Sequence, residues 1–576
     1  MEQKIKELSK ESLQKIILKM MTVLSKEQCE ELEVMIEACL GENNETGRIQ
    51  LTERMSQEFV SEKMKLLKQW MEQIDEGELY LDTEVYEDYS DSYWDREWIT
   101  EYEDNQGIGE KIQFMIRFAK DCTDDRKYQE ANFIYGWLWD MSVSTDSEFE
   151  GDPLDLELLL ENHIIRTDLE QLALMTLYAD YQVQEPENRA EDIYLYFSCH
   201  TFQKLHIKDM FYVGREELKG TEQFWKDWIA LLQTKNGETA GRLLQEAVLY
   251  YEGIEGLVNM ADKNCNLHPS LYLSAMKEYN KKHEYRQMEE IGERALNKID
   301  CKLKIRSKMA FIAAYASSCL MHTEKLMRFC WECFCSESTD RNFLRLFGMK
   351  TMAEKYGMRG GEVLQTVKRK NSAGYMSNEE TEQNILDEYG YYVLSFYTGD
   401  FQTVKDASKN PQASLGWSGN FIQYGIRLIL LYLYEKTIPS KAAANIADYV
   451  GFCDDKKDAD HILSFESEII EESRKLGVST FWNYFQRWKN YFQMSEKEKK
   501  VYLNWAEKIV YSRADAIVSG QYRRHYGEVA ALLAVTAEIK ESSGDIGAKK
   551  IIFQEYRKKY PRHSSFQAEM KSYFGM

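Results

Sequence analysis

Cysteine and histidine residues gather between positions 319 and 335 at spacings that could hold a metal ion. Cys319 is followed three residues later by His322, and Cys330, Cys333 and Cys335 come soon after. Zinc takes four nitrogen or sulfur ligands that converge tetrahedrally. Two facing helices could bring these side chains together, so a zinc-dependent enzyme is one interpretation of the cluster.

Core packing is the interpretation that the neighbouring residues favour. Phe329, Trp331 and Phe334 alternate with the cysteines, and a free cysteine is a common small residue of protein cores. A reactive thiol is the third interpretation. We therefore expect a packed helix pair here, and the predicted function includes no metal and no other cofactor.

Other catalytic patterns do not occur in the sequence. There is no G-x-x-x-x-G-K-[ST] phosphate loop, no G-x-S-x-G elbow and no H-E-x-x-H motif. The nine histidines are dispersed, with no two within four residues of each other. Acidic pairs are frequent, but none is distinguished by its surroundings as a general acid or base. The sequence predicts a protein that is not an enzyme.

The elements that would carry any site are helices. From Gly107 onward, apolar residues recur at steps of three and four in segments that short polar turns separate. Only 6 prolines occur, which disfavours a fold made of many tight β-turns. The expected fold class is all-α.

Three turns resemble one another and the turn of tetratricopeptide repeats. Residues 125–131, 282–288 and 399–404 each place a polar turn before an aromatic residue that can wedge two helices apart. Helix pairs of this kind stack on their neighbours. We predict an irregular α-solenoid, a right-handed superhelix of antiparallel, tetratricopeptide-like helix pairs. The expected divisions are N-terminal helices at 1–74, an acidic, aromatic-rich irregular segment at 75–106, a helical-repeat region at 107–375, and a C-terminal helical-repeat region with a basic end at 376–576.

Charge is distributed unevenly. Residues 75–104 hold 13 acidic residues and one basic residue, whereas residues 501–576 hold 12 Lys and Arg against 8 Asp and Glu. These stretches are either solvated surfaces or two binding surfaces, and Arg and Tyr are enriched at the centres of interfaces. The candidate partner-binding residues of the acidic stretch are Tyr86, Tyr89, Tyr93, Trp94 and Trp98. Those of the basic stretch are Arg513, Tyr522, Arg523, Arg524, His525, Tyr526 and Arg557.

Trp417 is a further candidate, because glycines flank it in a loop. It either closes the helix that begins near Asn420 and enters the core, or contacts a ligand.

Composition restricts the class of partner. The formal net charge of −23 disfavours nucleic acid, since phosphates repel an acidic surface. The N-terminus lacks the apolar stretch of a signal peptide, and no run of 18 apolar residues could span a membrane. The 11 cysteines, an odd number, fit free thiols in a reducing compartment. We expect a cytoplasmic protein that binds a protein or peptide; its oligomeric state is left open.

Several segments resemble the helical region of bacterial SWIM zinc-finger proteins. The similar segments are 8–13, the acidic tract leading into 107–111, and 152–156, 415–418, 513–518 and 522–527. The resemblance spans most of the chain and implies a helical scaffold associated with nucleic acid.

The zinc module of that family is missing from the sequence. It needs a C-x-C pair followed by C-x-H, and the single C-x-C here, at Cys333 and Cys335, has no C-x-H after it. The expected function is therefore a non-enzymatic helical-repeat scaffold that holds a protein or peptide in a concave groove. The alternative is an accessory factor that meets nucleic acid through the basic C-terminal unit.

Overall fold

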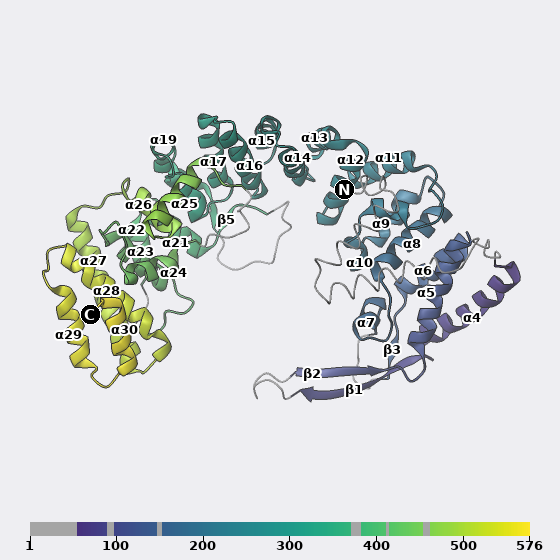
Figure 1. Cartoon of the computed structure of the whole chain (residues 1–576), viewed down its shortest axis with the longest axis horizontal. Helices are drawn as coiled ribbons and strands as arrows, with labels where there is room; N and C mark the ends of the chain where they lie inside the picture. The colour runs from purple at the N-terminus through teal and green to yellow at the C-terminus, as the bar shows by residue number, and fades with distance from the viewer. Residues whose placement is uncertain (1–54, 89–96, 147–152, 370–381, 410–413, 453–460) are drawn as a thin grey trace, which may run out of the picture. The chain divides into compact units, whose positions relative to one another are not determined.

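A computed structural model of the chain describes residues 55–88, 97–146, 153–369, 382–409, 414–452 and 461–576 (Figure 1). These residues form 27 α-helices and only five short strands, so the chain is mainly helical, as its sequence predicts. None of the helices in these ranges is long and apolar enough to cross a membrane.

The chain folds as two compact units. The first comprises Met1–Val183 with Met210–Glu217, and the second comprises Gln184–Asp209 with Leu218–Met576. The border at Val183 falls inside the region 107–375 that the sequence assigned to one helical array.

The first unit is built on helices that pack through apolar faces. In α5, buried residues recur at Ile108, Ile112, Met115 and Ala119, the spacing of one face of a helix. That face packs against α6 and α8, which contribute to the shared core. The helices of this unit are α4 (Gln57–Asp75), α5 (Ile108–Asp124), α6 (Tyr128–Asp140), α7 (Leu156–Glu161) and α8 (Leu169–Val183).

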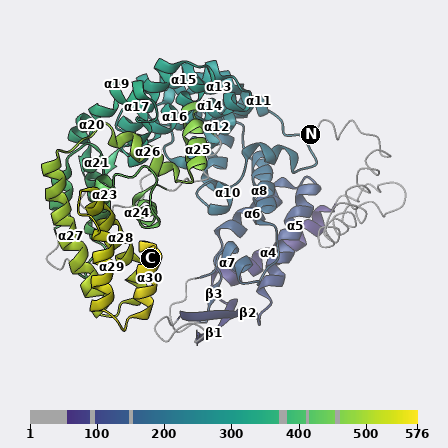
Figure 2. The ribbon, with the colours of Figure 1, turned by 60° about the vertical axis from the view of Figure 1, so that its left-hand side comes forward.

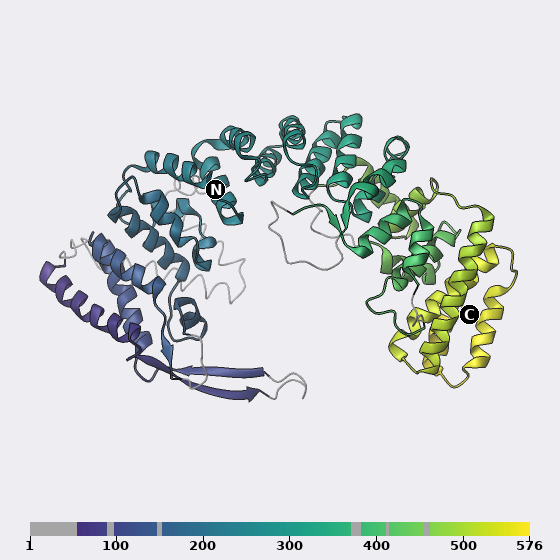
Figure 3. The same ribbon diagram turned by 180° about the vertical axis from the view of Figure 1, so that it is seen from behind.

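A β-hairpin replaces part of the irregular segment predicted at 75–106. Strand β1 (Tyr80–Asp88) pairs antiparallel with β2 (Glu97–Glu103), and the short β3 (Ser144–Thr145) adds in parallel at the start of β1. Figure 3 shows the hairpin extending beyond the helices of its own unit. The β-prone residues Val85 and Ile99 lie among acids, which hid the strand pattern in the sequence.

The second unit is a succession of helices that mostly pack on their neighbours in sequence, from α11 to α17 without interruption. Its elements are α9 (Arg189–Tyr196), α10 (His200–Gln203), α11 (Thr221–Leu232), α12 (Glu238–Tyr251), α13 (Gly253–Asn264), α14 (Ser270–Lys281), α15 (Tyr285–Lys298), α16 (Ile305–Cys319), α17 (Thr323–Ser336), α18 (Asp340–Arg345), α19 (Lys350–Lys355), α20 (Gly360–Thr366), β4 (Lys368–Arg369), β5 (Ile385–Leu386), α21 (Glu388–Tyr397), α22 (Phe401–Ala407), α23 (Ile422–Leu433), α24 (Lys441–Val450), α25 (Ser464–Leu476), α26 (Thr480–Lys489), α27 (Glu496–Ser519), α28 (Tyr526–Ser542), α29 (Ala548–Lys559) and α30 (Ser564–Phe574). Short 3₁₀ turns lie at Ile207–Tyr212, Gly357–Arg359 and Arg523–His525.

The three turns that look alike in the sequence share one backbone geometry. Arg126, His283 and Gly399 each have a positive φ, of 67°, 57° and 88°. In each turn the next residue's amide donates to the carbonyl five residues earlier, as Lys127 does to Cys122 at 2.8 Å. In each turn the left-handed residue's own amide also donates to the carbonyl three residues earlier, as Arg126 does to Thr123 at 3.2 Å. These two hydrogen bonds define the Schellman motif, which satisfies carbonyls that a helix end leaves unpaired.

Other turns have the same geometry, among them those after α16 and α27. Met321 and Gln521 hold the positive φ, both at 59°, and His322 and Tyr522 donate to the carbonyls five residues before them. The sequence did not reveal these turns, because neither has the aromatic residue that follows two positions after the left-handed residue in the other three.

Gly348 lies at the break between α18 and α19. Residues 342–356 are divided between these two helices, and a Cβ built at Gly348 would lie 2.4 Å from a ring carbon of Phe465 in α25. Arg487 of α26 also donates to the carbonyl of Gly348 at 2.9 Å. The break therefore lets α25 and α26 approach the backbone closely.

Candidate functional site

The cysteine cluster forms part of a helix-pair core. Cys330 and Cys333 lie on the buried face of α17, and the Cys333 thiol contacts the carbonyl oxygen of Ser307 at 3.5 Å. Cys335 is half-buried, while Cys319 is exposed at the end of α16. The structure therefore separates the exposed thiol from the buried ones.

His322, the fifth member of the predicted cluster, lies against a buried carboxylate. Its Nδ1 is 3.0 Å from Oε1 of Glu289, which also accepts hydrogen bonds from Ser317 and Lys325 at 2.6 Å each. Burial raises the pKa of Glu289, but these donors outweigh it and hold the pKa below its usual value. Across the described ranges, no group of three or more His, Cys, Asp or Glu residues is arranged to hold a metal ion.

The buried thiols should resist alkylation. Burial raises the pKa of Cys330 to about 12 and that of Cys333 well above its usual value. Since the thiolate is the nucleophile, iodoacetamide at pH 8 should modify Cys319 at least about 100-fold faster than Cys330 or Cys333. Peptide mapping of the alkylated native protein by mass spectrometry measures these rates. Equal rates would show that the α16–α17 core opens readily, and labelling in urea is the positive control.

Trp417 lies in the core instead of on a binding surface. Only 1% of its surface is exposed, and the guanidinium of Arg513 lies 4.7 Å from its ring centre. Arg513 is 3% exposed and donates to the carbonyl oxygens of Ser414 and Leu415 at 3.2 and 3.0 Å. These two candidate contacts are thus structural: the arginine ties α27 to the loop that carries the tryptophan.

A second buried arginine shares the carboxylate that faces Arg513. Glu528 of α28 lies 3.4 Å from Arg513 and 3.6 Å from Arg427, and its other oxygen is 3.0 Å from Nδ1 of His525. Burial lowers the pKa of Arg427, and the charge of Glu528 offsets this only in part. Next to this cluster Tyr526 is 3% exposed, so it too is a core residue and not part of a partner surface.

Exposed cations gather at one end of the C-terminal helices, which we call the basic end. Figure 2 shows α28, α29 and α30 side by side, and α28 packs on α27, α29 and α30. The cations come from two segments, one after α27 and one at the end of α29. Asp515 of α27 links these segments, because it pairs with Lys559 of α29 at 2.7 Å. The basic end consists of Arg523, Arg524, Arg557, Lys558 and Arg562, which are exposed and have no ion-pair partner among the described residues. Tyr522 (49% exposed) and His525 lie beside Arg523 and Arg524.

Two of the candidate residues of the acidic stretch, Tyr86 and Trp98, lie in the described strands of the hairpin. Tyr86 is 40% exposed and its hydroxyl donates to Glu101 on the facing strand at 2.7 Å. Trp98 occupies the position opposite Glu87 in the strand register. The other three candidates, Tyr89, Tyr93 and Trp94, lie outside the described residues.

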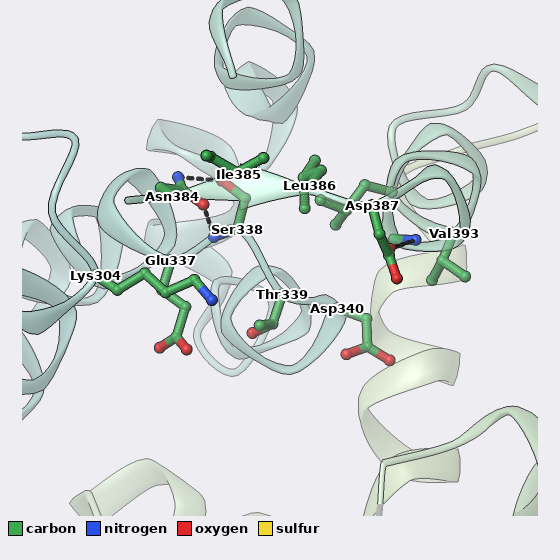
Figure 4. A pocket seen from close by; sticks show the side chains of 12 residues that line it. Lys304, Glu337, Ser338, Thr339, Asp340, Asn384, Ile385, Leu386, Asp387 and Val393 are labelled. Atoms are coloured by element: carbon green, nitrogen blue, oxygen red, sulfur yellow. Dashed lines mark hydrogen bonds between the residues drawn. The ribbon is translucent and has the colours of Figure 1, made fainter. Parts of the chain in front are cut away.

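A cleft of about 430 Å³ lies in the second unit, between the ends of several helices. Figure 4 shows Ile385 and Leu386 of β5 on one side of it, and Glu337, Thr339 and Asp340 on the other. The cleft is lined by Lys304, Glu337, Ser338, Thr339, Asp340, Asn384, Ile385, Leu386, Asp387, Gly390, Val393 and Leu394.

Hydrogen bonds and helix caps fix the walls of this cleft. Asn384 accepts from the amide of Ser338 at 3.1 Å and donates to the Ser338 hydroxyl at 3.0 Å, which ties β5 to the end of α17. Thr339 caps α18, and Asp387 caps α21 by accepting from the amide of Gly390 at 2.7 Å. These hydrogen bonds fix the positions of Asn384, Ser338, Thr339 and Asp387 in the walls of the cleft.

A second, smaller groove of about 240 Å³ crosses three consecutive helices. Residues one turn apart on α13 and α15 form its sides, and Tyr279 of α14 lies between them. The exposed groups that it offers are mainly polar: Glu255, Asn259, Gln287, Glu290 and Arg294. Neither this groove nor the cleft follows from any short motif in the sequence.

Comparison with known protein families, with curated proteins and with solved structures gives no match.

Proposed function

We propose that the chain is a non-enzymatic helical-repeat scaffold that holds a protein or peptide partner. The observation that carries this proposal is the groove across α13, α14 and α15, to which three successive helices contribute side chains. Amides such as those of Asn259 and Gln287 can both donate to and accept from a peptide backbone. A peptide in an extended conformation offers such groups along its length.

The helix order supports a solenoid as the scaffold. Successive helices from α11 to α17 pack on one another, and the same Schellman turn follows α14 and α16. A right-handed, tetratricopeptide-like superhelix would repeat these pairs and place the exposed faces of alternate helices in one continuous groove. The free thiols of the described cysteines suit a reducing, cytoplasmic compartment.

Nucleic-acid association is the second candidate function, and the basic end favours it. Its five cations could meet a run of phosphates, and Tyr522 beside them could stack on a base. Phosphate contacts weaken steeply with salt, whereas a peptide held through amides does not depend on salt to that degree. Binding that persists at high salt would thus favour the peptide.

Selection of displayed peptides tests the scaffold directly. We expect the full chain, immobilised in a high-salt buffer, to enrich particular peptides from a random phage library. The double variant Asn259→Ala and Gln287→Ala should bind the enriched peptides about ten-fold more weakly, since two hydrogen-bonding amides are lost. Anisotropy of the labelled peptides measures this loss.

The matched control removes two exposed amides elsewhere, in the double variant Asn297→Ala and Gln554→Ala. It should bind the peptides as the native chain does. No enrichment of any peptide would contradict the scaffold, and equal weakening in both variants would exclude the α13–α15 groove as the binding site.

A further inference from the structure

The cleft between α16, α17, β5 and α21 combines carboxylates with an apolar wall. Neither Glu337 nor Asp340 has an ion-pair partner among the described residues. Val393 and Leu394 of α21 contribute the apolar wall. An aliphatic stem that ends in a cation matches both surfaces.

The lysine of the cleft itself does not neutralise these acids. Lys304 pairs instead with Glu382, which precedes β5. Asp387 is likewise engaged, because it caps α21. Glu337 and Asp340 are the carboxylates that remain for a ligand.

The surroundings of Asp340 disfavour a solitary charge. Burial raises the pKa of this carboxyl above its usual value, although the Arg341 amide, which donates to it at 2.8 Å, and the positive charge of the Arg341 side chain both oppose the rise. A cation placed beside Asp340 would lower the pKa of its carboxyl and so oppose the effect of burial. The same physics that makes a buried carboxylate costly makes it a strong partner for a positive charge.

A second, independent feature lies on the same face of α21. Tyr397 follows Gly390, Val393 and Leu394 at helical spacing and is fully buried. Its hydroxyl has no hydrogen-bond partner among the described residues, and the charge of Asp340 adds to burial in raising its pKa. Tyr397 does not itself line the cleft, but its hydroxyl lies within reach of the charge of Asp340, which does. Buried hydroxyls are nearly always paired, so this one marks a place beside Asp340 where a ligand atom or a water would be bound.

We propose that this cleft receives a lysine or arginine side chain of the partner peptide. The aliphatic stem lies against Val393 and Leu394, and the cationic head lies between Glu337 and Asp340. This inference rests on the proposed scaffold function and specifies the chemistry of its partner. It involves a different place on the second unit from the groove across α13–α15, so each can be tested by itself.

Small blocked amino acids, each cationic one matched with an uncharged one, isolate the effect of the positive charge on binding. The probes are N-acetyl-lysine amide and N-acetyl-arginine amide, with N-acetyl-norleucine amide and N-acetyl-citrulline amide as uncharged partners of similar shape. Saturation-transfer NMR with the full chain should detect one or both cationic probes, at signals about ten-fold above those of the uncharged pair. The comparison of lysine with arginine decides which side chain the cleft prefers.

Two double variants locate the binding. Asp340→Asn with Glu337→Gln should reduce the signal of the cationic probe about ten-fold, and the new carboxamide next to Arg341 keeps an oxygen that can accept from the Arg341 amide. Glu471→Gln with Glu496→Gln changes the net charge equally at exposed positions outside the cleft and should leave the signal unchanged. Far-UV circular dichroism and the melting temperature confirm that both variants fold.

Three results would overturn the inference. These are equal signals from charged and uncharged probes, an unchanged signal in the cleft variant, and equal losses in the two variants. If the cationic probes do not bind in the cleft but the chain still enriches peptides, only the cation site is wrong. If the chain enriches no peptide but still binds the cationic probes, the scaffold function is wrong and the cation site remains.

Discussion

Replacement of Trp417 by alanine should lower the free energy of unfolding of the second unit by about 3–5 kcal/mol. The side chain is 1% exposed, and the guanidinium of Arg513 lies over its ring at 4.7 Å. The variant would lose the packing of a large aromatic residue and the cation–π contact together. It would also loosen the loop whose carbonyls at Ser414 and Leu415 accept from Arg513.

Urea unfolding followed by far-UV circular dichroism measures the effect of Trp417→Ala. Tyr522→Ala is the matched control, because Tyr522 is an aromatic residue with 49% exposure; it should change the free energy by no more than about 0.5 kcal/mol. Similar losses in the two variants would show that Trp417 does not stabilise the core in the way described.

Replacement of Glu466 by glutamine should cost about 3–5 kcal/mol, because it leaves a buried arginine without its counter-charge. Arg345 is 5% exposed and its Nε is 2.9 Å from the Glu466 carboxylate. Burial alone would lower the pKa of Arg345, but this carboxylate holds it above its usual value. Glutamine keeps one oxygen, which can still accept from the Leu463 amide, but its NH2 group then faces Arg345, so the loss reports the charge together with the hydrogen bond to the guanidinium.

The same helix supplies the control for Glu466→Gln. Glu471 of α25 pairs with Lys475 at 2.7 Å, but their side chains are 61% and 72% exposed. Solvent screens such a pair, so Glu471→Gln should change the free energy of unfolding by no more than about 0.5 kcal/mol. The difference between the two urea midpoints is the readout, and equal midpoints would contradict a buried ion pair.

The helices were predictable because their signal is local. In α17, for example, the apolar residues Leu326, Phe329, Cys330 and Cys333 recur at the helical period, and the structure buries all of them. The hairpin was missed for the opposite reason. Its pairing depends on a partner strand across the turn, and dense acids obscured the alternation of side chains.

The basic stretch shows where sequence reasoning about exposure succeeds and fails. Arg523 and Arg524 are exposed, as expected of charged residues in a short turn. Arg513 is not, because carbonyls and a carboxylate from remote segments satisfy its guanidinium. No pattern near Arg513 indicates those partners, so its burial could not be inferred locally.

The cleft could not be predicted from the sequence. It joins Lys304 and Val393 to the segment 337–340, and only three-dimensional packing brings these three parts of the chain together. A local capping residue such as Asp387 indicates only the start of a helix. The helix ends that form the cleft meet only when the unit is folded.

Because a Schellman turn is made by backbone hydrogen bonds, the geometry of a helix pair does not depend on the side chains on its surface. Arginine, histidine, methionine, glutamine and glycine all occupy the left-handed position in turns of this geometry, so the backbone hydrogen bonds and not the side chain define the bend. Mutations on exposed helix faces can then accumulate without reorienting the pair. A scaffold of the kind proposed above could then change its partner while its framework stays constant, so its specificity could evolve faster than its fold.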